Sequence, residues 1–196
     1  MTLFDLALLY KETLLDKLYA IHTENDVFYI KALPKNFLHL TGLQRTYNFS
    51  NIDAKSFYNN AINDCYKTNL NKVGYKSKSD RNMVSIKSRC FQWVRNTILN
   101  CDTVYYVRNT NDKANVLSVS FEINNKSKYC TVLFAKDKET DSEYYVPISF
   151  QIDQSFSYSI ANSAYDSARV IEVVEYDINS DEAKSIIKKL NNKIKI

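Results

Sequence analysis

The sequence predicts an α+β fold, in which N-terminal helices pack on a four- to five-stranded antiparallel sheet and a C-terminal helix ends the chain. The first hundred residues carry mainly helical hydrophobic patterns, with two short extended pieces among them. Residues 101–177 instead alternate short apolar segments with polar turns. Separate runs of helices and strands, with short connections between consecutive strands, are typical of an antiparallel sheet and not of a parallel, doubly wound one.

The composition supports one domain over residues 1–196. Hydrophobic residues make up 45% of the chain, which is enough to form a sizeable hydrophobic core. Gly and Pro, which are typical of linkers, number only two each. The net charge of +4 permits a nucleic-acid partner without requiring one. The four cysteines lack the CxxC spacing of zinc sites, and two glycines cannot form a phosphate-binding loop. We therefore expect no metal and no cofactor.

The N-terminal segment "MTLFDLALLYKETLLDKL" lacks the basic start of a secretory signal, and charged residues interrupt its apolar runs. We expect a cytoplasmic protein with no membrane partner.

The elements of the first half follow from local signals. Thr2 with Asp5 three residues later is typical of a helix start, and leucines then keep one face apolar to about Tyr19. Residues 26–33, "DVFYIKAL", have the composition of a strand, and residues 37–43, "FLHLTGL", are predicted to be a second extended piece. Helices are predicted over residues 50–70 and, most clearly, over residues 77–99.

The second half is predicted to form five strands and one helix. The strand candidates are bounded by polar turns such as "NTNDKA" and "KDKETDS", and they span residues 102–109, 115–123, 128–136, 143–151 and 168–176. Residues 181–196 then form an amphipathic helix pattern.

Four segments carry a resemblance to a known superfamily: "FYIKALPKNFLHLTGL", "KSFYNNAI", "RNMVSIKSRCFQWVRNTI" and "TVLFAKDKETDSEYYVPISF". Together they resemble a phage- and prophage-associated branch of the barnase, EndoU, colicin and RelE-like nucleases. The resemblance covers residues 26–151 as a nuclease-like core, and it leaves residues 152–196 as an additional strand and helix. It implies helices packed against a four-stranded antiparallel sheet and an RNA-cleaving or toxin-like role.

His39 is the candidate for acid–base chemistry. It is one of two histidines, and the resemblance implies that its "HLTG" segment lies in the active cleft. Metal-independent RNA cleavage uses the RNA 2′-hydroxyl as nucleophile, so one imidazole with cations and hydroxyls is enough. The alternative for His39 is a buried, hydrogen-bonded core histidine. His22 is expected to cap the first helix.

The other candidates supply hydroxyls, cations and an aromatic ring. Ser149 matches a polar position on a late strand that the resemblance implies, and period-two alternation places Tyr145 and Ser149 on one exposed face. The alternative for Lys87 and Arg81 is a solvated surface charge, and the alternative for Arg108 is an edge charge that opposes aggregation. Thr41 has a turn cap as its alternative, and Tyr145 and Ser149 have ordinary surface exposure. The expected catalytic residues are His39, Ser149, Lys87 and Arg108, and the expected substrate-binding residues are Thr41, Arg45, Arg81, Lys136 and Tyr145.

The sequence thus predicts a metal-independent endoribonuclease that acts as a toxin or phage-encoded effector. Its expected partners are RNA, either tRNA or mRNA, and an antitoxin or immunity protein. A second hypothesis is a catalytically inactive phage- or defence-associated protein that binds a host or phage protein. A third is an ADP-ribosyl- or nucleotidyl-transferase-like toxin, which would bind NAD or a nucleoside triphosphate.

Overall fold

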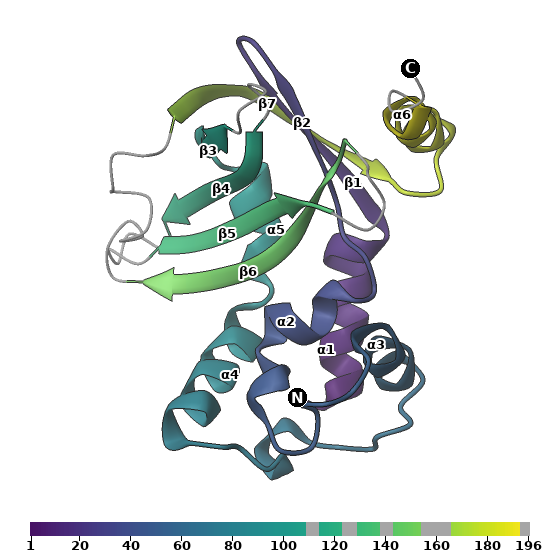
Figure 1. Cartoon of the computed structure of the whole chain (residues 1–196), viewed down its shortest axis with the longest axis vertical. Helices are drawn as coiled ribbons and strands as arrows, with labels where there is room; N and C mark the ends of the chain where they lie inside the picture. The colour runs from purple at the N-terminus through teal and green to yellow at the C-terminus, as the bar shows by residue number, and fades with distance from the viewer. Residues whose placement is uncertain (109–113, 123–128, 138–142, 154–165, 193–196) are drawn as a thin grey trace.

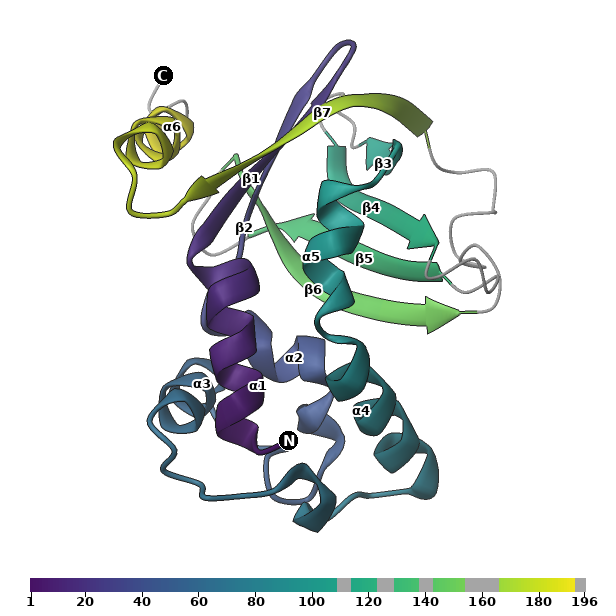
Figure 2. The same ribbon diagram turned by 180° about the vertical axis from the view of Figure 1, so that it is seen from behind.

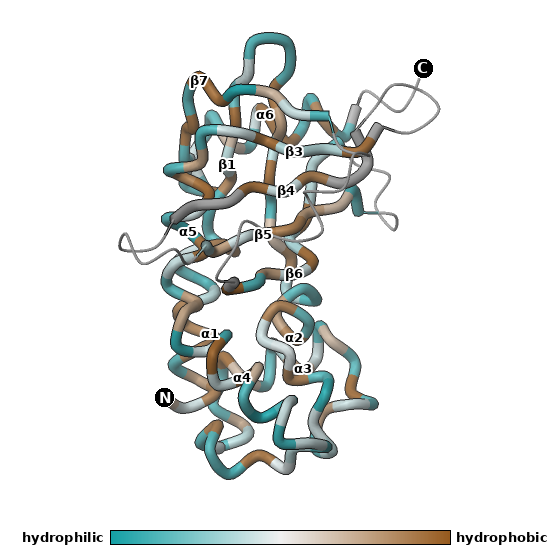
Figure 3. Tube along the Cα trace, turned by 90° about the vertical axis from the view of Figure 1, so that its left-hand side faces the viewer, coloured by the Kyte–Doolittle hydropathy of each residue, from teal (hydrophilic) through white to brown (hydrophobic). Residues whose placement is uncertain are grey.

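The computed structural model describes residues 1–108, 114–122, 129–137, 143–153 and 166–192. A group of helices forms one end of the molecule and a strongly curved sheet forms the other (Figure 1). Seen from the side, strands β3, β4, β5 and β6 stack above helices α1 to α4 (Figure 3). None of the helices in these ranges has the length and apolar character needed to cross a bilayer.

The first half of the chain contains most of the helices. In order, its elements are α1 (Leu3–Tyr10), the π-helical turn η1 (Lys11–Leu15), β1 (Lys17–Thr23), β2 (Val27–Lys31), α2 (Asn36–Thr41), the 3-10 turn η2 (Leu43–Arg45), α3 (Ala54–Ile62), the 3-10 turn η3 (Leu70–Lys72), α4 (Lys78–Cys90) and α5 (Trp93–Leu99). The second half contributes β3 (Thr103–Arg108), β4 (Ala114–Glu122), β5 (Tyr129–Lys136), β6 (Tyr145–Asp153), β7 (Asp166–Asp177) and α6 (Asp181–Asn192).

The seven strands close into a barrel in the order β1-β2-β6-β5-β4-β3-β7. Neighbouring strands are antiparallel except β2 and β6, which run parallel where Ile30 faces Tyr145. The prediction of a four- to five-stranded antiparallel sheet is therefore wrong. The five strands predicted after residue 101 are all present, but the sheet also includes β1 and β2, and β1 joins β2 to β7.

Strand β1 was not predicted, and the first helix was predicted to continue to about Tyr19, into the beginning of this strand. Helix α1 begins at Thr2, whose side chain accepts a hydrogen bond from the Asp5 amide in a capping box, and regular α-helix ends at Tyr10. Residues 17–23 instead form β1, which is buried along most of its length and is paired on both edges. Tertiary pairing outweighs the local helical pattern here, because an all-buried strand shows no alternation that sequence could reveal. His22 lies on this strand and caps no helix.

Two other predicted elements differ from the structure. Residues 36–41 form helix α2 and not an extended piece, because nearly all of its side chains are buried and a short apolar run does not distinguish the two states. The long helix predicted over residues 77–99 is two helices, with the fully buried Phe91 at the junction. In α4, the Ser88 hydroxyl donates to the Val84 carbonyl, a bond that bends helices.

One large core joins both ends of the molecule. Side chains from α1, α2, α3 and α4 pack continuously with those of β1, β4 and β5. Helix α5 lies against β4, β5 and β7, as seen from behind in Figure 2. A small second cluster joins Leu190 of α6 to Tyr144 and Val146 at the start of β6. The helical end and the barrel therefore share one core, and β6 touches both α2 and α4.

Candidate active site

A pocket of about 340 Å³ lies where α2, η2 and α4 meet the middle of β6. This is the boundary between the helical end and the barrel (Figure 1). It brings together four residues that were predicted from the sequence as parts of a site: His39, Arg45, Lys87 and Ser149. The remaining lining residues are Asn36, Gly42, Gln44, Met83 and Ile148.

Gly42 allows the helices that carry these groups to approach each other. It ends α2 with φ of +77°, a left-handed conformation that side chains disfavour. A Cβ atom at this position would lie 2.9 Å from Cε of Met83 and 3.7 Å from Cδ of Lys87, both on α4. The distance to Met83 is too short for a real contact, whereas the distance to Lys87 is an ordinary van der Waals contact. A side chain at position 42 would therefore be strained and would move Met83, but it would leave room for Lys87.

Lys87 is the most perturbed group in the pocket. Its side chain is half-buried, and its Nζ lies 5.2 Å from the centre of the Phe150 ring. Burial, and secondarily the nearby positive charge of Arg45, lower the pKa of Lys87 to about 8. The ammonium is therefore mainly charged at neutral pH but gives up its proton far more readily than an ordinary lysine.

The pocket has a cationic lining. Arg45 is well exposed, and its guanidinium lies 3.6 Å from the Asp80 carboxylate at the beginning of α4. None of the described residues that line the pocket is an Asp or Glu. Gln44 adds a buried Oε1 atom that accepts no hydrogen bond. A phosphate group would find two cations and no opposing carboxylate among these lining residues.

Ser149 reaches the pocket because β6 contains a bulge. Leu133 of β5 faces Ser149, but the next residue, Phe134, faces Pro147, so Ile148 has no partner and is 41% exposed. The expectation that Tyr145 and Ser149 share an exposed face is wrong. Tyr145 is 5% exposed and packs against Phe28 in the main core.

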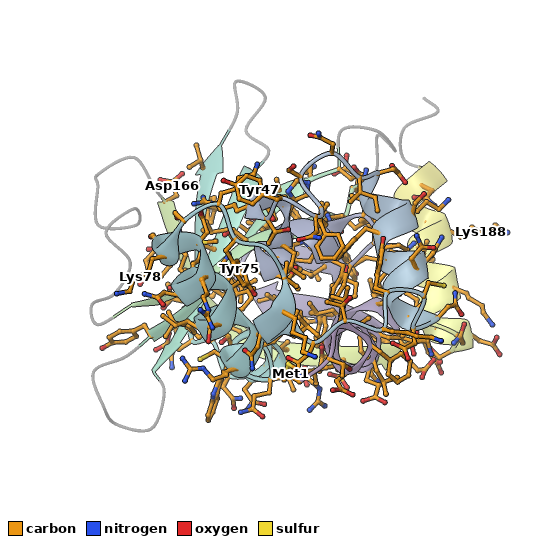
Figure 4. All side chains as sticks on the ribbon, turned by 90° about the horizontal axis from the view of Figure 1, so that it is seen from below. Met1, Tyr47, Tyr75, Lys78, Asp166 and Lys188 are labelled. Atoms are coloured by element: carbon orange, nitrogen blue, oxygen red, sulfur yellow. The ribbon has the colours of Figure 1, made fainter. Side chains whose placement is uncertain are left out.

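The other predicted site residues lie elsewhere. Thr41 is fully buried, and its hydroxyl donates to the Phe37 and Leu38 carbonyls within α2. Arg81 lies on a different side of α4, in a separate pocket with Tyr75 and Met1 at the helical end (Figure 4).

The Lys136 ammonium donates a hydrogen bond of 2.7 Å to the Glu143 carboxylate. Its side chain lines a second pocket beside the first one. The backbone of Arg108 ends β3, which is separated from β6 by β4 and β5; its side chain lies outside the described part.

Sequence reasoning missed Asn36, Gln44, Met83 and Ile148 as members of the pocket. Asn36 is buried, and its Oδ1 accepts a hydrogen bond from the Leu33 amide at the start of α2. No local signal marks these residues, because their shared position depends on how α2, α4 and β6 cross. The bulge that exposes Ile148 also has no clear sequence signature beyond the nearby proline.

One imidazole, two cations and a hydroxyl in a single pocket are the groups that acid–base chemistry on a phosphodiester requires. In the described ranges, no three His, Cys, Asp or Glu side chains are grouped in a way that could hold a metal ion.

Residues 2–192 match the family model described as phage-Barnase-EndoU-ColicinE5/D-RelE like nuclease4. The chain belongs to this family, which confirms the superfamily resemblance and supports a nuclease-type function in broad terms. The match extends beyond residues 26–151 at both ends, so it includes β1, β7 and α6. Comparisons with curated proteins and with solved structures gave no match.

Proposed function

We propose that this protein is an endoribonuclease that cleaves RNA without a metal ion and acts as a toxin or phage-encoded effector. The observation that carries the proposal is the convergence of His39, Arg45, Lys87 and Ser149 on one pocket. His39 and Arg45 come from the consecutive elements α2 and η2, whereas Lys87 and Ser149 come from α4 and β6, which are distant in the sequence from them and from each other. Membership of a nuclease-like family supports the same chemistry.

In the proposed reaction, the RNA 2′-oxygen forms a bond to the adjacent phosphorus and the 5′-oxygen of the next nucleotide leaves. His39 accepts the proton of the 2′-hydroxyl, and the Lys87 ammonium gives its proton to the leaving oxygen. Arg45 and the Ser149 hydroxyl bind the non-bridging oxygens and stabilise the charge that develops on them. The products are a 2′,3′-cyclic phosphate and a free 5′-hydroxyl, and both side chains then exchange protons with water.

The test is cleavage of a defined RNA by the purified protein in the presence of EDTA. We expect fragments with cyclic-phosphate ends, and we expect His39→Ala to lower the rate by about 100-fold or more. His22→Ala is the matched control, because the other histidine lies on β1 and lines neither the candidate pocket nor the one beside it. Cleavage by His39→Ala at the wild-type rate would contradict the proposal, as would products without cyclic phosphate.

The effector role is tested in a bacterial host. Induction of the wild-type protein should arrest growth and produce new cyclic-phosphate ends, and sequencing these ends would show whether tRNA or mRNA is the substrate. Both effects should be lost in His39→Ala. If wild type and His39→Ala were folded and equally harmless, with no new ends, the chain would instead act as a binding protein.

A further inference from the structure

A second pocket adjoins the candidate active site. It shares Asn36, His39 and Ile148 with the first pocket, so the two pockets lie side by side. Its volume of about 760 Å³ is in the range of small-molecule sites and is more than twice that of the first pocket. The proposed cleavage chemistry uses only the first pocket and leaves this one without a role.

The wall of the second pocket is largely apolar. Leu33, Pro34 and Ala135 line it together with Val146 and Ile148 of β6. Ile148 stands at the boundary between the two pockets, and the bulge in β6 leaves it 41% exposed. Ile148 therefore places exposed apolar surface directly beside the cationic pocket.

The two pockets differ in the charged residues that line them. In the first, Lys87 and Arg45 line the site without a lining carboxylate. In the second, Lys35 forms an ion pair with the lining carboxylate of Asp137 at 2.8 Å, and Lys136 forms one with Glu143 at 2.7 Å. The two other charged lining residues, Asp53 and Lys55, are exposed and opposite in sign. A phosphate is therefore favoured in the first pocket, and an uncharged group with apolar faces is favoured in the second.

We propose that the second pocket is a nucleoside subsite, which holds the base and sugar next to the cleaved phosphate with the base against Ile148. The inference rests on the proposed function, because it assumes that the phosphate of an RNA chain occupies the first pocket. Unpaired bases in single-stranded RNA are usually held by stacking on an aromatic or guanidinium plane. Here the exposed Ile148 side chain would instead cover the apolar face of the base by hydrophobic contact. The subsite would give the enzyme a preference for the base on one side of the cut.

The test compares Ile148→Ala with Ile171→Ala on an RNA of random sequence. Ile171 lies on β7 and is 67% exposed, so it is a matched exposed isoleucine away from both pockets, and both variants should unfold at the wild-type temperature. We expect Ile148→Ala to raise KM about fivefold to tenfold, given the apolar area removed, and to weaken the base preference at the cleaved ends. Ile171→Ala should match the wild type in both respects.

The failure of the subsite and the failure of the proposed function give different results. If the protein cleaves RNA but Ile148→Ala keeps the wild-type KM and base preference within twofold, the subsite is wrong and the nuclease stands. If neither the wild type nor any variant cleaves RNA, the subsite is tested by measuring the affinity of the wild type and both variants for a non-cleavable 2′-fluoro RNA of random sequence. A loss of fivefold or more in Ile148→Ala alone would support the subsite, whereas equal affinities or no binding would overturn it.

Discussion

At the scale of single residues, the site depends on environments that sequence position does not show. Lys87 stands between Ile86 and Ser88 on a helix whose neighbouring face carries several exposed charges, and a solvated lysine was the simpler interpretation. In the structure the Lys87 side chain is half-buried, and it lies over the Phe150 ring and close to Gly42. This burial lowers the pKa of Lys87. By contrast, Thr41 was predicted to bind substrate, but its hydroxyl donates to the Phe37 and Leu38 carbonyls within its own helix.

The lowered pKa of Lys87 predicts a pH dependence for RNA cleavage. Because the reaction uses the protonated amine, the wild-type rate should fall as the pH rises through the Lys87 pKa of about 8. Lys87→Arg keeps the charge but does not titrate in this range, so it should be slower and lose the alkaline decline. Lys87→Met should lose about 100-fold at neutral pH, and this difference from the wild type should shrink as the pH rises through the Lys87 pKa. The measurement is the single-turnover rate between pH 6 and about pH 10.

The matched control for this series is Lys136→Met, a lysine that is bonded to Glu143 and does not line the first pocket. Its alkaline decline should coincide with that of the wild type. An unchanged alkaline decline in Lys87→Arg would show that another group sets the pH dependence.

At the scale of elements, contacts between distant segments override local preferences. Residues 37–43 were predicted as a strand and form most of α2, and the bulge in β6 reverses the alternation expected there. The helix over residues 77–99 divides where Phe91 enters the core. Arg95 of α5 donates two hydrogen bonds, of 2.7 and 3.0 Å, to the Glu175 carboxylate of β7.

The Arg95–Glu175 pair ties α5 to the strand that closes the barrel, and it predicts a pH-dependent stability. Hydrogen bonding from Arg95 holds the pKa of Glu175 below its ordinary value. The pair therefore stabilises the fold above about pH 4.5, and the contribution is lost as the pH falls through the lowered pKa. Glu175→Gln should cost about 1 kcal/mol in the free energy of unfolding at pH 7, and the difference should shrink in acid.

This prediction is checked by urea unfolding at pH 7 and at about pH 3.5. Asp16→Asn removes the more exposed Lys11–Asp16 pair and should change the free energy of unfolding by less than about 0.5 kcal/mol. Equal losses for the two variants at pH 7, or a Glu175→Gln deficit that persists unchanged in acid, would contradict the assigned role.

At the scale of the whole molecule, we expect closure of the barrel to make the chain one cooperative unit. Strand β7 pairs with both β1 and β3, so it joins the beginning of the chain to the middle. Helix α6 is attached differently: it packs Leu190 against Tyr144 and Val146 in a small cluster beside the main core. The two C-terminal elements should therefore contribute unequally to stability.

Two truncations test this organisation of the single domain. Ending the chain after Asp153 removes β7, exposes one edge of both β1 and β3, and should abolish cooperative unfolding. Ending it after Asn179 removes only α6 and should leave a folded protein that is less stable by about 1–3 kcal/mol. Thermal unfolding followed by circular dichroism measures both. A cooperative transition in the shorter chain would show that residues 152–196 are an accessory to an independent core.

The five strands after residue 101, the terminal helix and the nuclease superfamily could be predicted from the sequence, because periodicity, turn residues and family motifs are local signals. The predicted fold class was wrong, because it did not include the closed, mixed barrel. The sequence by itself also named His39, Arg45, Lys87 and Ser149, which the structure brings to one pocket. Only the tertiary structure decided that residues 17–23 form a strand, that the sheet closes into a barrel, and that Ile148 faces the pockets while Tyr145 enters the core. Those outcomes depend on pairing and burial between distant segments, and such contacts leave no pattern within a single segment.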